Sequence, residues 1–142
     1  MTASNVKTKA RHKARCLLVQ ALYQQRIAEH DFSDIEDEYI TDEFSEGADL
    51  SYFVKILRGI AANMQKIDEN FSEFLDIAIH KLDVIELSIL RIATYELLHE
   101  QELSHKIIIN EAIELAKTYG GQDGHKFVNG VLNQVAKKIR SE

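Results

Sequence analysis

The chain of 142 residues contains no proline, and its apolar residues recur at intervals of three and four nearly everywhere. Proline interrupts helices, and this spacing is typical of amphipathic helices. No segment alternates apolar and polar residues for long, so we predict no sheet. We therefore expect an all-α fold of about seven helices in one domain, residues 1–142, with packed sub-bundles over about 8–67 and 68–140.

The apolar spacing also predicts where individual helices lie. The stretch 83–99 is apolar almost all round, which is typical of a central, buried helix. Ser104 is placed to cap a helix that runs to about 119, where Gly120 and Gly121 supply a stop. The remaining helices are expected near 8–29, 33–46 and 50–67, then after a cap at Asp68, and from a cap at Asp123 to about 140.

The charge is divided between two short segments, although the net charge is −6. Residues 6–15 hold five lysines or arginines and no acid, whereas residues 29–49 hold ten acids and no lysine or arginine. Such a split indicates a basic contact surface on an otherwise repelling body. The overall acidity is therefore a poor guide to nucleic-acid binding.

The one cysteine and the lack of long apolar runs indicate where the protein works. Cys16 cannot form an internal disulfide, which fits a reducing compartment, and we interpret it as a half-buried structural residue. No apolar run approaches the roughly 18 residues needed to span a membrane. The basic N-terminus lacks the apolar segment of a signal peptide, so we expect a cytoplasmic protein without membrane contact.

Motifs of enzymes and cofactor sites do not occur. The sequence lacks HExxH, a P-loop, a nucleophile elbow and a dinucleotide-binding glycine motif. His99, Glu102 and His105 cluster in a predicted turn, but nothing else supplies a closed set of metal ligands. We expect no enzymatic activity, no cofactor and no metal.

A stripe of cations follows the first predicted helix. Lys7, Arg11 and Arg15 are spaced i, i+4 and i+8, so they share one face. Like charges at this spacing repel each other, and an anionic partner such as RNA phosphate would offset that repulsion. Alternatively, the stripe is a solvated face near a frayed terminus, and the pattern alone does not decide between the two.

The last predicted helix begins with an aromatic residue that lies off its apolar stripe. Phe127, Lys126 and Asn129 all face away from the stripe by helical geometry. Such a group suits single-stranded RNA, because the ring can stack on a base, the amide can read a base edge and the lysine can meet phosphate. Alternatively, Phe127 packs against a neighbouring helix.

Glu86 follows Asp83 by three residues, which is the spacing of a capping box. Glu86 is also the chief charge in a very apolar stretch, so contact with a partner is the alternative. The two roles are compatible.

Three stretches resemble the NusB family. They are ARCLLVQALY (14–23), LRIATYEL (90–97), and INEAIELAK (109–117) continuing as HKFVNGVL (125–132). The resemblance covers essentially the whole chain in the right order and spacing, and the last two strings together are highly specific.

The resemblance implies an all-helical fold of two small bundles and a role in transcription antitermination. It implies binding to the boxA element of nascent ribosomal RNA leaders, jointly with NusE, a ribosomal small-subunit protein. With NusA and NusG, this assembly loads onto RNA polymerase and lets it pass terminators.

The resemblance also implies an RNA surface that combines the basic first helix with the segment after the double glycine. Glu86 matches a partner-contact position of the family, and Asp123 matches a position that affects the activity of the complex. The residues carried over to the RNA surface are Arg11, Lys13, Arg15, Gln20, Tyr23, Lys126 and Phe127.

The chain departs from the family in one place, and two alternative functions remain. The family's arginine run is here Arg11-His12-Lys13, which predicts weaker or pH-sensitive RNA binding, since lysine lacks the arginine fork. One alternative is the N-terminal RNA-binding part of an RNA cytosine methyltransferase, although this chain lacks room for the methyltransferase domain itself. The other is a homodimeric helical interaction module without direct RNA contact.

Overall fold

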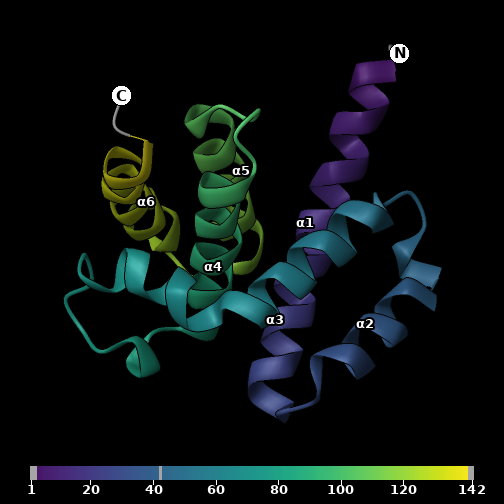
Figure 1. Cartoon of the computed structure of the whole chain (residues 1–142), viewed down its shortest axis with the longest axis horizontal. Helices are drawn as coiled ribbons and strands as arrows, with labels where there is room; N and C mark the ends of the chain where they lie inside the picture. The colour runs from purple at the N-terminus through teal and green to yellow at the C-terminus, as the bar shows by residue number, and fades with distance from the viewer. Residues whose placement is uncertain (1–2, 42, 141–142) are drawn as a thin grey trace.

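The computed structural model describes residues 3–41 and 43–140, and these form helices joined by turns (Figure 1). There are six α-helices and two short 3₁₀-helices within the described residues, close to the predicted seven. The α-helices are α1 (Ala3–Ala28), α2 (Phe32–Thr41), α3 (Leu50–Ser72), α4 (Val84–His99), α5 (His105–Tyr119) and α6 (Gly124–Arg140). The 3₁₀-helices are η1 (Glu43–Ser45) and η2 (Ile79–Lys81).

Side-chain caps begin three of the helices. The carboxylates of Asp49 and Asp83 accept hydrogen bonds from the backbone N–H groups of Tyr52 and Glu86, at the starts of α3 and α4. The hydroxyl of Ser104 accepts one from Ile107 at the start of α5. These bonds satisfy N–H groups that have no partner inside the helix. The predicted cap at Ser104 and the Asp83 half of the capping box are confirmed.

The prediction that a new helix begins after Asp68 is wrong. α3 continues from Leu50 to Ser72, because Ile67 and Phe71 prolong its buried face. Asn63 has non-helical backbone angles and marks a kink, where its amide donates to the carbonyl oxygen of Gly59. Instead of capping a helix, the carboxylate of Asp68 accepts two hydrogen bonds from Arg91 on α4, each of 2.9 Å.

The expected helix 33–46 is also shorter than predicted. α2 ends at Thr41, and η1 follows as a separate short turn of helix. The hydroxyl of Thr41 accordingly donates back to the carbonyl oxygens of Asp37 and Glu38. Hydroxyl groups that bond to the backbone in this way compete with helical hydrogen bonds.

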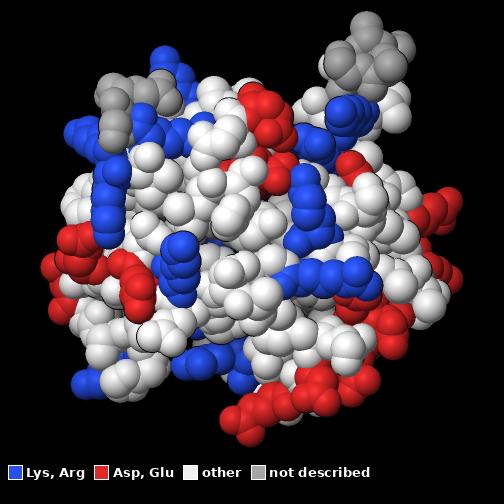
Figure 2. All heavy atoms as spheres, viewed as in Figure 1, with Lys and Arg blue, Asp and Glu red and all other residues white. Residues whose placement is uncertain are grey.

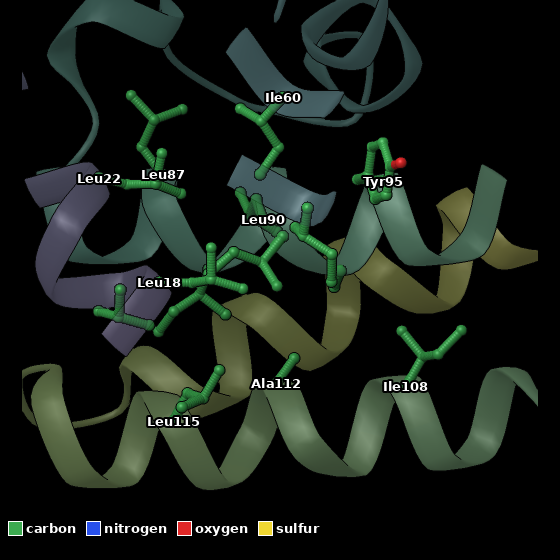
Figure 3. Packing of buried hydrophobic residues seen from close by; sticks show 14 of the residues in the cluster. Leu18, Leu22, Ile60, Leu87, Leu90, Tyr95, Ile108, Ala112 and Leu115 are labelled. Atoms are coloured by element: carbon green, nitrogen blue, oxygen red, sulfur yellow. The ribbon is translucent and has the colours of Figure 1, made fainter. Parts of the chain in front are cut away.

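α4 lies at the centre of the protein, as its apolar sequence predicts. Its residues from Leu87 to Leu97 are all buried, and it packs against α1, α3, α5 and α6. Figure 3 shows side chains from three of these helices pointing toward α4, among them Leu18 of α1, Ile60 of α3 and Leu115 of α5. Burying each large apolar side chain contributes about 1.5–3 kcal/mol, so this packing stabilises the whole fold.

The other five α-helices of the described residues gather on two sides of α4. α1, α2 and α3 pack together on one side, while α5 and α6 pack against each other and α4 on the other. α1 extends past this bundle toward the N-terminus (Figure 1). Among the described residues, no helix is both long enough and apolar enough to cross a membrane.

Candidate nucleic-acid interface

The exposed cations of α1 surround its N-terminal half. Lys7, Lys9 and Lys13 are exposed, and the ammonium group of Lys13 donates to the carbonyl oxygen of Glu46 at 3.2 Å. Figure 2 shows basic side chains near the beginning of α1 and acidic side chains along the edge formed by α2. A polyanion would therefore be attracted to α1 and repelled by α2.

Arg11 is half-buried between α1 and the beginning of α3. Its guanidinium carbon lies 4.4 Å from the centre of the Tyr52 ring, and its Nε lies 3.8 Å from the Asp49 carboxylate. This Nε has no hydrogen-bond partner among the described residues. The guanidinium thus lies within cation–π distance of the ring, and 21% of the side chain stays exposed to solvent.

Arg15 lies inside the protein rather than on the predicted exposed stripe. Only 3% of its surface is exposed. Its Nε and Nη2 donate to Oε2 of Glu96 at 3.0 and 2.8 Å, and its Nη1 donates to Oε1 of Glu111 at 2.8 Å. At Arg15, the repulsion between the cations of the stripe is thus offset by two carboxylates of the protein itself and not by RNA phosphate.

The environment of Arg15 keeps it charged. Burial alone would lower the pKa of Arg15, but the charge and hydrogen bonds of Glu96 outweigh burial and raise it. Burial raises the pKa of Glu96, and burial together with the Glu96 charge raises the pKa of Tyr52, whose hydroxyl donates to the same carboxylate. Arg15 therefore joins α1 to α4 and α5 and has no free face for a phosphate.

His12 and Cys16 continue the contact between α1 and α5. Nδ1 of His12 lies 3.3 Å from Oε1 of Glu111, and Nε2 lies 3.6 Å from Sγ of Cys16. Cys16 is half-buried, as interpreted from the sequence, and burial raises the pKa of its thiol. A thiol with a raised pKa is mostly protonated and unreactive, which supports a structural role.

Gln20 connects α1 to the end of α5. Its Nε2 donates to the hydroxyl of Tyr119 at 3.2 Å, immediately before the double glycine. Tyr23, one turn further along α1, is 42% exposed. Through this hydrogen bond the basic helix and the segment leading to α6 meet on the same side of the protein.

The beginning of α6 presents the second group of predicted RNA contacts. Lys126 and Asn129 are exposed, and Nζ of Lys126 lies 3.3 Å from the carboxylate of Asp123. Phe127 is half-buried against the core, so its ring is neither sealed inside nor fully free. Asp123 has a φ of 67°, and its carbonyl oxygen accepts hydrogen bonds from the N–H groups of Lys126 and Phe127.

Glu86 lies against the same helix start. A Cβ added to Gly124 would lie 2.9 Å from Oε2 of Glu86, so the carboxylate would have to move aside for a side chain at position 124. Partial burial, and then the charge of Asp83, raise the pKa of Glu86. The two predicted partner residues, Glu86 and Asp123, therefore both lie at the junction of α4 with α6.

The predicted turn with His99 holds no metal-binding arrangement in the described residues. Across 3–41 and 43–140, no three His, Cys, Asp or Glu side chains are placed to hold an ion. The His99 ring instead lies 4.6 Å from the centre of the Tyr95 ring.

Four residues that build this region were not predicted from the sequence pattern, namely Tyr52, Glu96, Glu111 and Tyr119. Glu96 could have been suspected, because a carboxylate inside a helix that is apolar all round needs a buried cation. Nothing in the local sequence identifies Arg15 as that cation.

The fold and the site together define a helical protein with a basic helix beside the start of its last helix. The NusB family model matches residues 12–137. The chain is 43% identical over 135 residues to the transcription antitermination protein NusB of Idiomarina loihiensis, covering 95% of this chain and 97% of that protein. It is 44% identical over 138 residues to the transcription antitermination protein NusB of Pseudomonas savastanoi pv. phaseolicola, covering 97% of this chain and 84% of that protein. The chain therefore belongs to the NusB family.

Solved structures show the same fold. A structure of NusB from T. maritima, 36% identical, has a TM-score of 0.78 and covers 90% of this chain and 91% of that one. A chain in a crystal structure of antitermination factors NusB and NusE in complex with dsRNA, 22% identical, has a TM-score of 0.76 and covers 91% and 97%.

Membership in this family agrees with two expectations from the sequence. The relatives are named for transcription antitermination rather than for a reaction, which supports the expectation that the protein is not an enzyme. The chain matches 97% and 84% of the length of two such antitermination proteins, which disfavours the alternative that it is one part of a methyltransferase.

Proposed function

We propose that this protein binds boxA RNA of nascent ribosomal transcripts jointly with NusE. Together with NusA and NusG, it helps RNA polymerase pass terminators. The observation that carries this proposal is the hydrogen bond between Gln20 and Tyr119, which brings α1 and the start of α6 to one side of the molecule. A single RNA strand could then contact both.

The exposed residues divide into phosphate and base contacts by their chemistry. Lys7, Arg11 and Lys13 on α1 and Lys126 on α6 are cations at or near the surface, suited to phosphate. Tyr23, Phe127, Gln20 and Asn129 offer rings and amides, suited to bases. Arg15 acts differently in this proposal, because it holds α1 in place through Glu96 and Glu111.

The proposed protein partner docks beside the RNA. Glu86 and Asp123 lie at the junction of α4 with α6, where Glu86 approaches Gly124 and Asp123 pairs with Lys126. The related NusB chain described above comes from a complex that contains NusE and dsRNA. A partner at this junction would adjoin RNA at the start of α6, so each ligand would strengthen binding of the other.

A binding titration tests the proposal. Fluorescence anisotropy would compare a boxA-containing single-stranded RNA with a scrambled RNA and with a boxA duplex, each with and without NusE. We expect the single-stranded boxA RNA to bind most tightly, and NusE to increase the preference. Equal binding of boxA and scrambled RNA in both conditions would contradict the proposal.

A further inference from the structure

A cavity of about 320 Å³ opens between the first half of α1 and the beginning of α5. Lys7 and Arg11 line it from α1, while Leu103, Ile107 and Asn110 line it from the opposite side. The last three residues lie outside the interface described above.

The α5 side of the cavity combines an apolar surface with an amide. Ile107 is 50% exposed, although isoleucine is usually buried, and Asn110 is exposed one turn further along the same helix. A flat ring can pack on the isoleucine while the amide donates to and accepts from its edge. This is the chemistry that recognises an unpaired base.

The charges around the cavity favour a ligand that carries phosphate. Lys7 and Arg11 line it, so both of its α1 cations that reach the surface face the cavity. The acid in its wall, Glu111, already accepts a hydrogen bond from Arg15 and lies 3.3 Å from His12. Its negative charge is therefore partly offset, because Arg15 is shared with Glu96.

The size of the cavity favours a base over a protein helix. Small-molecule pockets measure about 300–1,000 Å³, so this cavity lies near the lower end of that range. A helix with its side chains is about 10–12 Å wide and needs a longer groove. A single ring with its attached phosphates fits the observed volume and charge better.

The cavity lies along the same junction of α1 with α5 as the proposed RNA surface. The junction continues through His12 and Glu111 to Gln20 and Tyr119. At about 1.5 Å per residue, Lys7 and Gln20 are roughly 20 Å apart along α1. One strand of several nucleotides could therefore follow α1 from the cavity to the start of α6.

We propose that an unpaired base of the bound RNA inserts into this cavity. The base packs on Ile107 and bonds to Asn110, and Lys7 and Arg11 contact the adjoining phosphates. This inference rests on the proposed function and extends its RNA site to α5.

The experiment combines protein variants with an abasic scan. Single-stranded boxA RNA, with each nucleotide in turn replaced by an abasic one, is titrated against the wild-type chain, Ile107→Glu and Asn110→Ala, with and without NusE. Ile107→Glu should weaken binding of the intact RNA about tenfold or more, since it fills the cavity with negative charge. One abasic position should weaken wild-type binding and have a smaller effect on Asn110→Ala, because the hydrogen bond to Asn110 is already absent from that variant and only the packing on Ile107 is left to lose.

The matched control is Ile77→Glu, the same substitution at an isoleucine that is 51% exposed between α3 and α4. It should bind RNA like the wild type. The inference would be overturned if both cavity variants bound RNA as tightly as the wild type and if no abasic position had a smaller effect on Asn110→Ala than on the wild type. So would variants that weaken NusE binding but leave RNA affinity intact, since the cavity would then hold protein. If the wild type fails to distinguish boxA from scrambled RNA, the proposed function itself fails.

Discussion

At the scale of single residues, the acids around each cation of α1 decide what it can bind. Arg15 and Lys13 are two positions apart in the sequence, yet Arg15 is buried between Glu96 and Glu111 while Lys13 is exposed. A buried cation with two carboxylates contributes to the folded state, and its removal leaves those carboxylates without compensation. An exposed lysine has little effect on stability and remains available to phosphate.

We predict that Arg15→Ala lowers the free energy of unfolding by about 3–5 kcal/mol, because Glu96 would stay buried without its cation. Lys13→Ala should change it by less than about 0.5 kcal/mol. Urea unfolding followed by circular dichroism measures both. Equal midpoints for Arg15→Ala and the wild type would show that the buried ion pair does not stabilise the fold.

At the scale of helices, close packing of α3 on α4 requires glycine at one position. A Cβ added to Gly59 would lie 2.2 Å from the Tyr95 ring, so the buried ring or the helices themselves would have to shift to admit any side chain. The helix α3 is also kinked near this contact with Tyr95. The kink lies at Asn63, four residues after Gly59, and the Asn63 amide donates a hydrogen bond to the Gly59 carbonyl oxygen. Glycine in a helix costs stability locally, and here the packing offsets that cost.

We predict that Gly59→Ala destabilises the protein by about 1–3 kcal/mol through overpacking, although alanine favours a helix. The matched control is Gly130→Ala on α6, where no atom lies within 4 Å of the added Cβ. That variant should stabilise the protein by about 0.5–1 kcal/mol. Thermal unfolding compares the two, and a stabilised Gly59→Ala would mean that α3 and α4 pack less closely than described.

At the scale of the whole molecule, the fold gives the segment after α1 and the beginning of α1 opposite local charge. The acids that follow α1 in sequence lie on and around α2, along one edge, and the lysines of the first half of α1 lie at its exposed beginning, while other basic side chains are spread over the rest of the surface (Figure 2). The protein is acidic overall, with a net charge of −6, yet an approaching anion meets a local positive surface at the beginning of α1. Repulsion elsewhere would restrict how RNA can approach.

We predict that Lys7→Ala combined with Lys13→Ala flattens the salt dependence of RNA binding. For single strands, the slope of log affinity against log salt falls by about 0.7 for each phosphate that is no longer neutralised, or about 1.4 for both. Titrations at several salt concentrations measure it. Arg58→Ala with Lys66→Ala makes the same change in net charge on α3 and should leave the slope unchanged. An unchanged slope in the α1 variant would remove these lysines from the site.

The candidate site was predictable from the sequence only where a residue's position follows from its own helix. Lys13, Lys126 and Asn129 are exposed as the helical pattern indicates, and their contact with RNA stays a prediction. Arg15 and Phe127 were harder, because the pattern places them on a face without saying which other helix covers that face. The cavity at Asn110 was missed for the same reason, since half of its lining comes from α1.

The helical class, the central position of the helix within 83–99 and the cap at Ser104 all followed from the sequence, because each depends on residues within one or two turns of one another. Three pairings needed the packed helices: Arg15 with Glu96, Asp68 with Arg91 instead of starting a helix, and Gln20 with Tyr119. Those pairs join residues on different helices. The spacing of apolar residues shows which face of a helix is buried, but it does not show which helix lies against that face.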